Sequence, residues 1–96
     1  MSIYLTATVK SKPGNSEALK ELLLVLVENS KKEEACLQYD LHQSQNEPDF
    51  FIFHEEWENQ AGLDLHNKQP HIVHFIAASA HLIEGQISIY QTNKIA

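Results

Sequence analysis

The segment from Phe50 to Phe53 most constrains the fold of this chain, because it places four consecutive apolar residues in what its surroundings indicate is a β-strand. Successive strand residues point to opposite faces of a sheet, so this strand is apolar on both faces. A sheet with water on one side would instead alternate apolar with polar residues. We therefore expect both faces of the sheet to be covered.

Alternation of apolar and polar residues predicts the other strands. The clearest signal lies in residues 3–9, and residues 86–92 alternate in the same way. Residues 36–43 and 50–57 form two further expected strands. The turn-forming residues 44–49 between them predict an antiparallel hairpin. The chain thus has four strands from which to build one sheet.

Three helical segments are predicted between these strands, at residues 16–30, 60–67 and 70–82. Asn15 or Ser16 is placed to cap the first helix, whose apolar residues recur at the spacing of an amphipathic helix. Asn59 is placed to cap the second helix, and Pro70 suits the first position of the third. The step before Pro70 therefore breaks the later helical region in two.

The resulting order, β-α-β-β-α-β, predicts an α+β fold of the ferredoxin-like type, a four-stranded antiparallel sheet with its helices on one face. Residues 1–96 are expected to form a single domain, since no linker or repeat interrupts them. The other sheet face would be bare, although residues 50–57 carry apolar side chains there. A second copy packed face to face would cover it, so we expect a homodimer that forms a dimeric α+β barrel.

The charge balance excludes two classes of partner. With 7 Lys and Arg against 13 Asp and Glu, the formal net charge is −6, and the chain lacks the basic clusters that bind nucleic acid or anionic lipid. The apolar run from Leu22 to Val27 is too short for a membrane span, and no secretory signal is recognisable. We expect a soluble, cytoplasmic protein.

Several kinds of catalytic motif are absent from the sequence. The glycines at positions 14, 62 and 85 are too dispersed for a phosphate-binding loop, and no nucleophile elbow of the form Gly-x-Ser-x-Gly is present. Cys36 is the only cysteine and is expected to be a buried, inert thiol; the alternative is a nucleophile with a lowered pKa. These absences disfavour nucleotide, flavin and covalent acyl chemistry, and no cofactor is expected.

The candidate site lies after residue 50. Glu55 and Trp57 are two residues apart on one strand and share a face with Phe53, while His66 follows on the inward side of the next helix. These side chains could line one small pocket. Gly62, one turn before His66, would leave room for a ligand or would merely mark a weak helix.

Each of these residues also has a purely structural interpretation. Trp57 could close the core as a lid, and His66 could be a buried histidine that is hydrogen-bonded to a backbone carbonyl. Glu55 could be exposed and paired with a cation such as Lys68, although a carboxylate on an apolar face otherwise indicates a sheet edge or a polar cavity. The local pattern leaves both interpretations open.

Three histidines, His71, His74 and His81, fall on one stripe of the last predicted helix and invite a metal hypothesis. Only His71 and His74 are near enough to share an ion, and this helix lacks the carboxylate that usually completes such a site. We therefore expect a solvated or dimer-facing row of histidines rather than a metal site.

Several motifs stand in a characteristic order and spacing along the chain. They are Glu55-x-Trp57, Ala61-x-Leu63, His66 and Pro70-His71-Ile72, with Glu33-Glu34-Ala35-Cys36-Leu37-x-Tyr39 and the Pro13-Gly14 turn upstream. Together they resemble the antibiotic biosynthesis monooxygenase family of small dimeric α+β barrel proteins. The likeness covers nearly the whole chain and departs at Ala35, where the family usually has glycine.

The resemblance implies a monooxygenase that uses molecular oxygen to oxidise a small electron-rich aromatic compound, such as a quinol or phenol, without flavin, haem or metal. A deprotonated quinol can itself reduce oxygen, so the pocket need supply only a base, an apolar surface and exclusion of water. By this resemblance, His66 would be the base or would orient the substrate, and Glu55 would assist at its polar end. The implied substrate-binding residues are Trp57, which would stack on the substrate, Tyr39, His71 and Phe53.

Rival functions of the same fold differ in the residues that they need. The haem-degrading branch relies on a strand-one asparagine, where this chain offers only Tyr4, Thr6 and Thr8, so haem degradation is disfavoured. An isomerase of a phosphorylated signalling sugar would favour Arg or Lys near the pocket, and the segment of residues 55–81 contains only Lys68. A non-catalytic ligand-binding dimer is the other alternative.

Overall fold

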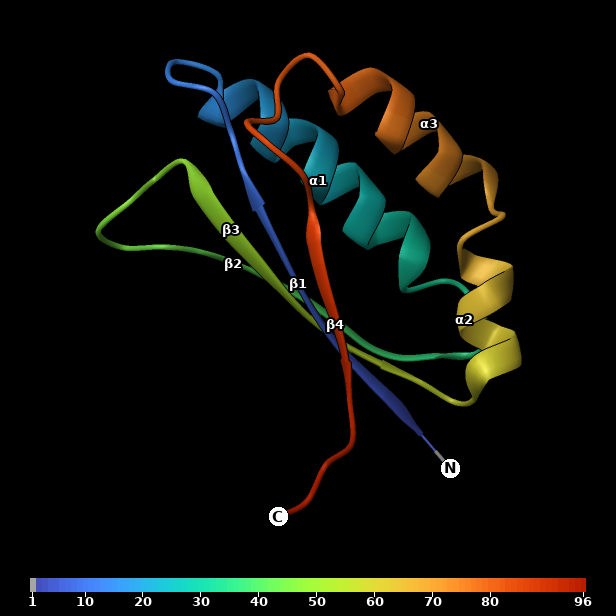
Figure 1. Ribbon diagram of the computed structural model, residues 1–96. Coiled ribbons are helices and arrows are strands. Elements are labelled where there is room, and N and C mark those ends of the chain that lie inside the picture. The colour runs from blue at the N-terminus through green and yellow to red at the C-terminus, as the bar shows by residue number, and fades with distance from the viewer. Residues whose placement is uncertain (1) are drawn as a thin grey trace.

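The computed structural model describes residues 2–96 and contains one four-stranded sheet and three helices. The strands are β1 (Ile3–Lys10), β2 (Cys36–Gln43), β3 (Phe50–Trp57) and β4 (Ser88–Thr92), and the helices are α1 (Ser16–Ser30), α2 (Gln60–His66) and α3 (Pro70–Ser79). The strand order is β2-β3-β1-β4, and each neighbouring pair is antiparallel. This arrangement confirms the predicted ferredoxin-like α+β fold (Figure 1).

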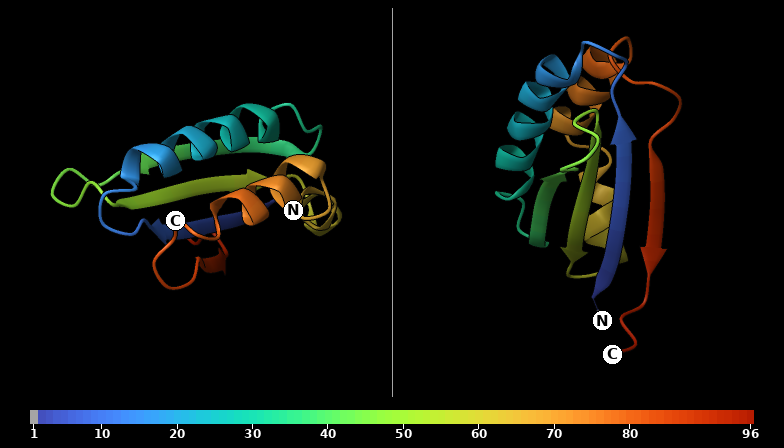
Figure 2. Two further views of the ribbon diagram at one scale, coloured as in Figure 1. Left: turned by 90° about the horizontal axis from the view of Figure 1, so that it is seen from above. Right: turned by 90° about the vertical axis from the view of Figure 1, so that its left-hand side faces the viewer.

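The helices lie together on one face of the sheet, with α1 and α3 side by side (Figure 2). The covered face carries the alternate side chains of β1 and β3, of which Val9, Phe51 and Trp57 are almost completely buried. From the helices, Leu19 and Leu23 of α1 fill the space above them. The period-two and amphipathic patterns therefore identified the core correctly, because burial of these side chains is the main force that stabilises the fold.

The opposite face is open in the chain, since no helix within residues 2–96 covers it (Figure 2). Its central residues include Thr8 and Ile52, which are paired across β1 and β3, and Thr6 and His54, which are paired two positions further along. Phe50 and Ile52 are only partly buried. The prediction of apolar residues on both faces of β3 is thus confirmed, but only at the end of the strand that contains Phe50 and Ile52.

The third helix ends earlier than predicted, at Ser79 rather than near residue 82. The following residues bond to the end of β1 instead: Lys12 donates its backbone N–H to the carbonyl of Leu82, and Glu84 donates to that of Lys10. This pairing also places Leu82 in the core. A longer helix would forfeit both backbone hydrogen bonds, and β4 then begins at Ser88, two residues later than predicted.

The two predicted helix caps have different outcomes. Asn59 caps α2 as expected, because its side-chain oxygen accepts the backbone N–H of Gly62 at 2.8 Å. Asn15 occupies the position before α1, but its side chain makes no capping hydrogen bond, so that part of the prediction is wrong. Within residues 2–96, no helix combines the length and the apolar character needed to cross a membrane.

Candidate active site

A cavity of about 390 Å³ lies between the covered face of the sheet and the helices. This volume falls in the range of small-molecule sites. Its polar lining residues are Tyr39, Glu55, His66, Asn67 and Gln86, and its apolar ones are Leu5, Ala7, Leu26, Phe53, Leu63, Ile72, Phe75, Ile76, Ile87 and Ile89. Four of the six predicted site residues thus line one cavity, whereas Trp57 and His71 do not.

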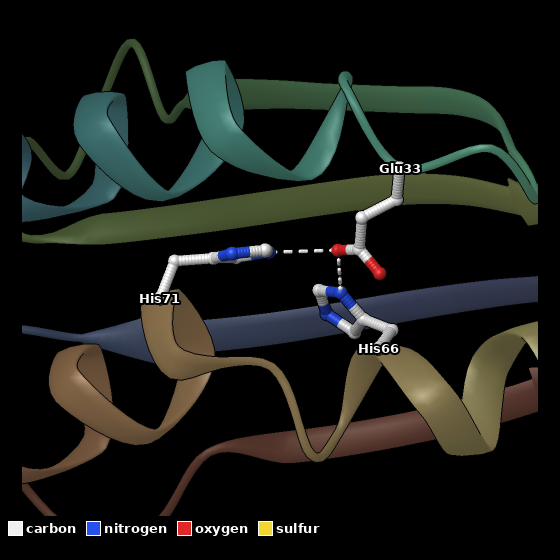
Figure 3. A group of neighbouring side chains, drawn as sticks. All are labelled: Glu33, His66 and His71. Carbon is white, nitrogen blue, oxygen red and sulfur yellow. Dashed lines mark hydrogen bonds and ion pairs between the residues drawn. The ribbon is translucent and has the colours of Figure 1, made fainter.

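His66 is the last residue of α2 and is 3% exposed. The expectation that it faces inward is confirmed, but its partner is not a backbone carbonyl. Its Nδ1 lies 2.6 Å from Oε2 of Glu33, a residue in the turn between α1 and β2. The same oxygen lies 2.7 Å from Nε2 of His71, in the first turn of α3 (Figure 3). Three separate segments of the chain therefore meet at one carboxylate oxygen.

The second ring nitrogen of His66, Nε2, is not the one that meets Glu33. Among residues 2–96, Nε2 has no hydrogen-bond partner. It is also not fully buried, unlike the unpaired hydroxyl groups of Ser30 and Ser79. His66 itself lines the cavity. An ionised carboxylate can only accept hydrogen bonds, so Glu33 fixes the His66 proton on Nδ1 and leaves Nε2 free to act as a base.

Trp57 lies behind the His66 ring rather than in the cavity. It is fully buried, and its ring centroid is 4.5 Å from that of His66. Its Nε1–H donates a hydrogen bond to Oε1 of Glu55 at 2.9 Å. The indole therefore presents no free face to a substrate in the cavity, and it supports both cavity-facing polar groups from the side of the core.

Comparison with known proteins places this geometry in a family. Residues 2–78 match the family model described as antibiotic biosynthesis monooxygenase. The chain belongs to the antibiotic biosynthesis monooxygenase family. The expected family membership is thus confirmed.

Several relatives in this family align with most of the chain. YcnE of Bacillus subtilis (strain 168), named provisionally as a monooxygenase, is 31% identical over 90 residues, which are 94% of this chain and 95% of that protein. An uncharacterized protein, sll1783, of Synechocystis sp. is 31% identical over 91 residues. That match covers 93% of this chain but only 62% of the longer Synechocystis protein.

Solved structures show the same fold for this family member. The crystal structure of PA3566 from Pseudomonas aeruginosa superimposes with a TM-score of 0.94 at 35% identity, over 99% of this chain and 95% of that one. A crystal structure titled antibiotic biosynthesis monooxygenase superimposes with a TM-score of 0.92 at 26% identity, over 98% of this chain and 99% of that one.

Burial controls the protonation of the cavity-facing groups. It lowers the pKa of His66 despite the hydrogen bond and charge of Glu33, which act in the opposite direction. Burial also raises the pKa of Glu55 to about 7, against the hydrogen bond from Trp57, and it raises the pKa of Tyr39 strongly. Near neutral pH, the cavity therefore combines the neutral imidazole of His66 and the neutral phenol of Tyr39 with a Glu55 carboxyl group that is close to half-ionised.

Two alternatives from the sequence are corrected by this environment. Glu55 is not exposed or paired with Lys68, because it is 7% exposed and bonds to Trp57. Cys36 is half-buried rather than fully buried, and burial raises the pKa of its thiol to about 11. A raised pKa disfavours the thiolate at neutral pH, so the structure supports an inert rather than a nucleophilic cysteine.

Gly62 makes room for the protein rather than for a ligand. A side chain at this position would overlap the Cβ of Ala35 and would also approach Oδ1 of Asn59. The backbone carbonyl of Ala35 accepts a hydrogen bond from the N–H of Glu58 at 2.9 Å, just before α2. Gly62 thus allows α2 to pack closely on the turn that carries Glu33, so the expectation of a ligand space beside it is wrong.

Glu33 is the candidate site residue that sequence reasoning missed. It was part of a family-like motif, but no pattern showed that its side chain would meet histidines 33 and 38 residues away. Glu33, His66 and His71 form a group whose potential metal-ligand atoms all lie within 4.8 Å of one another. The carboxylate that is absent from α3 is therefore supplied by the α1–β2 turn, and His66 rather than His74 stands beside His71.

Proposed function

We propose that this protein is a cofactor-independent monooxygenase that oxidises a small electron-rich aromatic compound, a quinol or a phenol, with molecular oxygen. The observation that carries the proposal is the Glu33–His66 pair, whose imidazole lines a largely apolar cavity and is bonded to Glu33 through only one of its nitrogens. Membership of the family and the monooxygenase names of relatives support the same reaction class.

The first step is proton transfer from the substrate hydroxyl to Nε2 of His66. The lowered pKa keeps this imidazole neutral and able to accept a proton near pH 7, while Glu33 stabilises the imidazolium that forms. A carboxylate that orients an imidazole and stabilises its charged form is a recurrent device in proton-transfer sites. The Glu33–His66 pair would therefore generate the substrate anion.

The anion then supplies the electrons that reduce oxygen. For a phenol, one oxygen atom becomes bonded to a ring carbon, the other leaves as water, and the substrate gives up four electrons to become a quinone. The protein has to hold the ring and keep bulk water from the reactive species. Phe53, Phe75 and Ile72 offer apolar walls for the ring.

Glu55 and Tyr39 serve the polar end of the substrate in this proposal. Because burial raises the pKa of Glu55 to about 7, part of the population carries a proton that can be donated to a substrate oxygen. Trp57 holds this carboxyl group in place through its indole N–H and packs against His66. We therefore assign Trp57 a positioning role rather than a stacking contact with the substrate.

The cavity lining favours a neutral aromatic substrate over a phosphorylated sugar. None of the described residues that line it is Lys or Arg, the side chains that recognise phosphate through charge-assisted hydrogen bonds. A second polar hollow beside β1 includes Lys94, but its other lining residues include Glu55 rather than a further basic side chain. Neither place therefore offers the paired basic side chains that would recognise a phosphate group.

Oxygen consumption tests the proposal. Metal-stripped protein is incubated with a panel of hydroquinones and phenols in an oxygen electrode, and His66→Ala is expected to lower the turnover number by about 10² to 10⁴-fold, the usual contribution of a general base. His74→Ala is the matched control, because His74 lies one turn along α3 from His71 and outside the cavity. Oxygen uptake equal to the buffer blank for every compound, together with measurable hydroquinone binding, would favour a non-catalytic ligand-binding protein.

The open sheet face is the expected dimer interface. Phe50 and Ile52 are only partly buried on it, and a second sheet packed against it would remove them from water. Sedimentation equilibrium is expected to give the mass of a homodimer for the native protein and of a monomer for Ile52→Asp. A monomer for both proteins would contradict the dimeric barrel.

The cytoplasm is the proposed location of the protein.

A further inference from the structure

Three potential metal-ligand atoms converge beside the cavity. Nδ1 of His66 and Nε2 of His71 lie 2.6 and 2.7 Å from one oxygen of Glu33, and all three donor atoms are within 4.8 Å of one another. The side chains come from the end of α2, the start of α3 and the α1–β2 turn (Figure 3). All three are largely shielded from water. Two imidazoles and one carboxylate make up a donor set that suits Zn²⁺ with one position left open.

The charge at this place also favours a cation. Among residues 2–96, the only ion-pair partners of the Glu33 carboxylate are the two imidazoles, and no Lys or Arg reaches it. A second carboxyl group, that of Glu55, lies on the same side of the sheet and is also buried. A buried carboxylate without a permanently charged partner is costly, and a divalent ion would supply the missing charge.

To admit an ion, the Glu33 carboxylate has to move away from both imidazoles. Ligand atoms at about 2.0 to 2.1 Å from a tetrahedral zinc ion are roughly 3.3 Å apart, so the two short nitrogen–oxygen distances would have to widen by about 0.6 Å. Glu33 lies in a turn and has three rotatable side-chain bonds, so its carboxylate can make this shift. The two imidazole nitrogens, which lie within 4.8 Å of each other, would also have to settle at roughly 3.3 Å.

We propose that Glu33, His66 and His71 bind Zn²⁺, and that the bound ion switches off the base at the cavity. The ion-binding part stands by itself, whereas the inhibitory part rests on the proposed monooxygenase function. With the ion on Nδ1, the proton of the neutral His66 ring moves to Nε2, the nitrogen that Glu33 leaves free. A nitrogen that carries a proton donates a hydrogen bond and no longer accepts the substrate proton.

Direct binding is the first test, and it needs no substrate. Chelator-treated native protein is titrated with ZnSO₄ by calorimetry, and we expect one saturable site per chain whose affinity falls at least 100-fold in Glu33→Gln and in His71→Ala. His74→Ala is the control for the alternative His71–His74 pair and is expected to keep the native affinity. His54→Ala is the control for the open face, where the rings of His42 and His54 lie 5.4 Å apart. Affinity lost in His74→Ala or His54→Ala but kept in Glu33→Gln would overturn the site.

The second test follows the proton on His66. Long-range ¹H–¹⁵N spectra of the native protein are expected to show the Nδ1–H tautomer without Zn²⁺ and the Nε2–H tautomer with one equivalent. If the protein consumes oxygen with a hydroquinone, one equivalent of Zn²⁺ should lower the rate at least tenfold, and EDTA should restore it. A rate raised by Zn²⁺ would overturn the inhibitory role, and an unchanged tautomer under saturating Zn²⁺ would overturn ligation through Nδ1. A protein that binds Zn²⁺ at this site but never consumes oxygen would contradict the proposed monooxygenase function and leave the metal site supported.

Discussion

The two faces of the sheet are made by alternate residues of the same strands, yet they differ in what they contain. On the covered face, β3 contributes two phenylalanines, the Glu55 carboxyl group and Trp57, and all of these side chains are buried. On the open face, the same strand contributes Phe50, Ile52 and the exposed His54. The comparison shows that Glu55, which lines the cavity, lies among buried apolar side chains. Exclusion of water therefore controls its protonation.

The largest expected difference between the faces is in packing. Phe51→Ala removes an almost completely buried side chain and is expected to lower the free energy of unfolding by about 3 to 5 kcal/mol. Ile52 is the adjacent residue on the open face. Ile52→Ala should lower the free energy of unfolding by about 1 kcal/mol in the monomer, and by more at protein concentrations where the dimer forms. Urea unfolding at two protein concentrations measures both. A large cost for Ile52→Ala that does not depend on concentration would contradict the distinction between the faces.

The next largest effect concerns Glu55 and pH. Its pKa is raised from 4.5 to about 7 in the fold, so the protonated group favours the folded state: this contribution is fully present below pH 4.5 and is lost as pH rises through 7. Glu55→Gln keeps a neutral acceptor for the Trp57 N–H and should therefore be more stable than the native protein above pH 7, by up to about 3 kcal/mol. Thermal unfolding of both proteins from pH 4 to pH 9 gives the difference curve. A difference that stays flat through pH 5 to 8 would show that Glu55 is not desolvated.

A smaller effect is expected where α2 meets the turn that carries Glu33. Gly62→Ala should destabilise the protein by about 1 to 3 kcal/mol, because the added methyl group overlaps Ala35. Ala35→Gly in the same chain removes the overlapping atom, so the double variant should recover most of the loss. A double-mutant cycle by urea unfolding measures this coupling. Additive costs would contradict a direct contact between the two positions.

Much of this arrangement could be predicted from periodicity alone. Alternation along β3 placed Glu55 and Trp57 on one face, and the structure shows them hydrogen-bonded there. Helical spacing placed His66 on the inward side of α2, where it is indeed buried. Both are local consequences of how side chains are arranged on a strand or a helix, so they need no knowledge of the rest of the chain.

The remaining features depend on contacts between distant segments. The meeting of Glu33 with His66 requires the turn after α1 to lie over the end of α2, which no local pattern records. The space at Gly62 is occupied by Ala35 for the same reason. The complete burial of Trp57 depends on the His66 ring packed beside it. Sequence patterns could therefore single out these residues, but not the distant residues that they contact.

The interruption between α2 and α3 decides which atoms can meet at Glu33. In one continuous helix, residues 66 and 71 would be five positions apart, about 140° around the axis and about 7.5 Å along it, so their rings would point away from each other. Three non-helical residues, Asn67 to Gln69, turn the chain so that both rings approach a single oxygen from different directions. The short linker thus sets the relative direction of the two imidazole rings. Relatives in which it is longer or straighter would lose the contact of both histidines with one carboxylate oxygen, even if they kept both histidines.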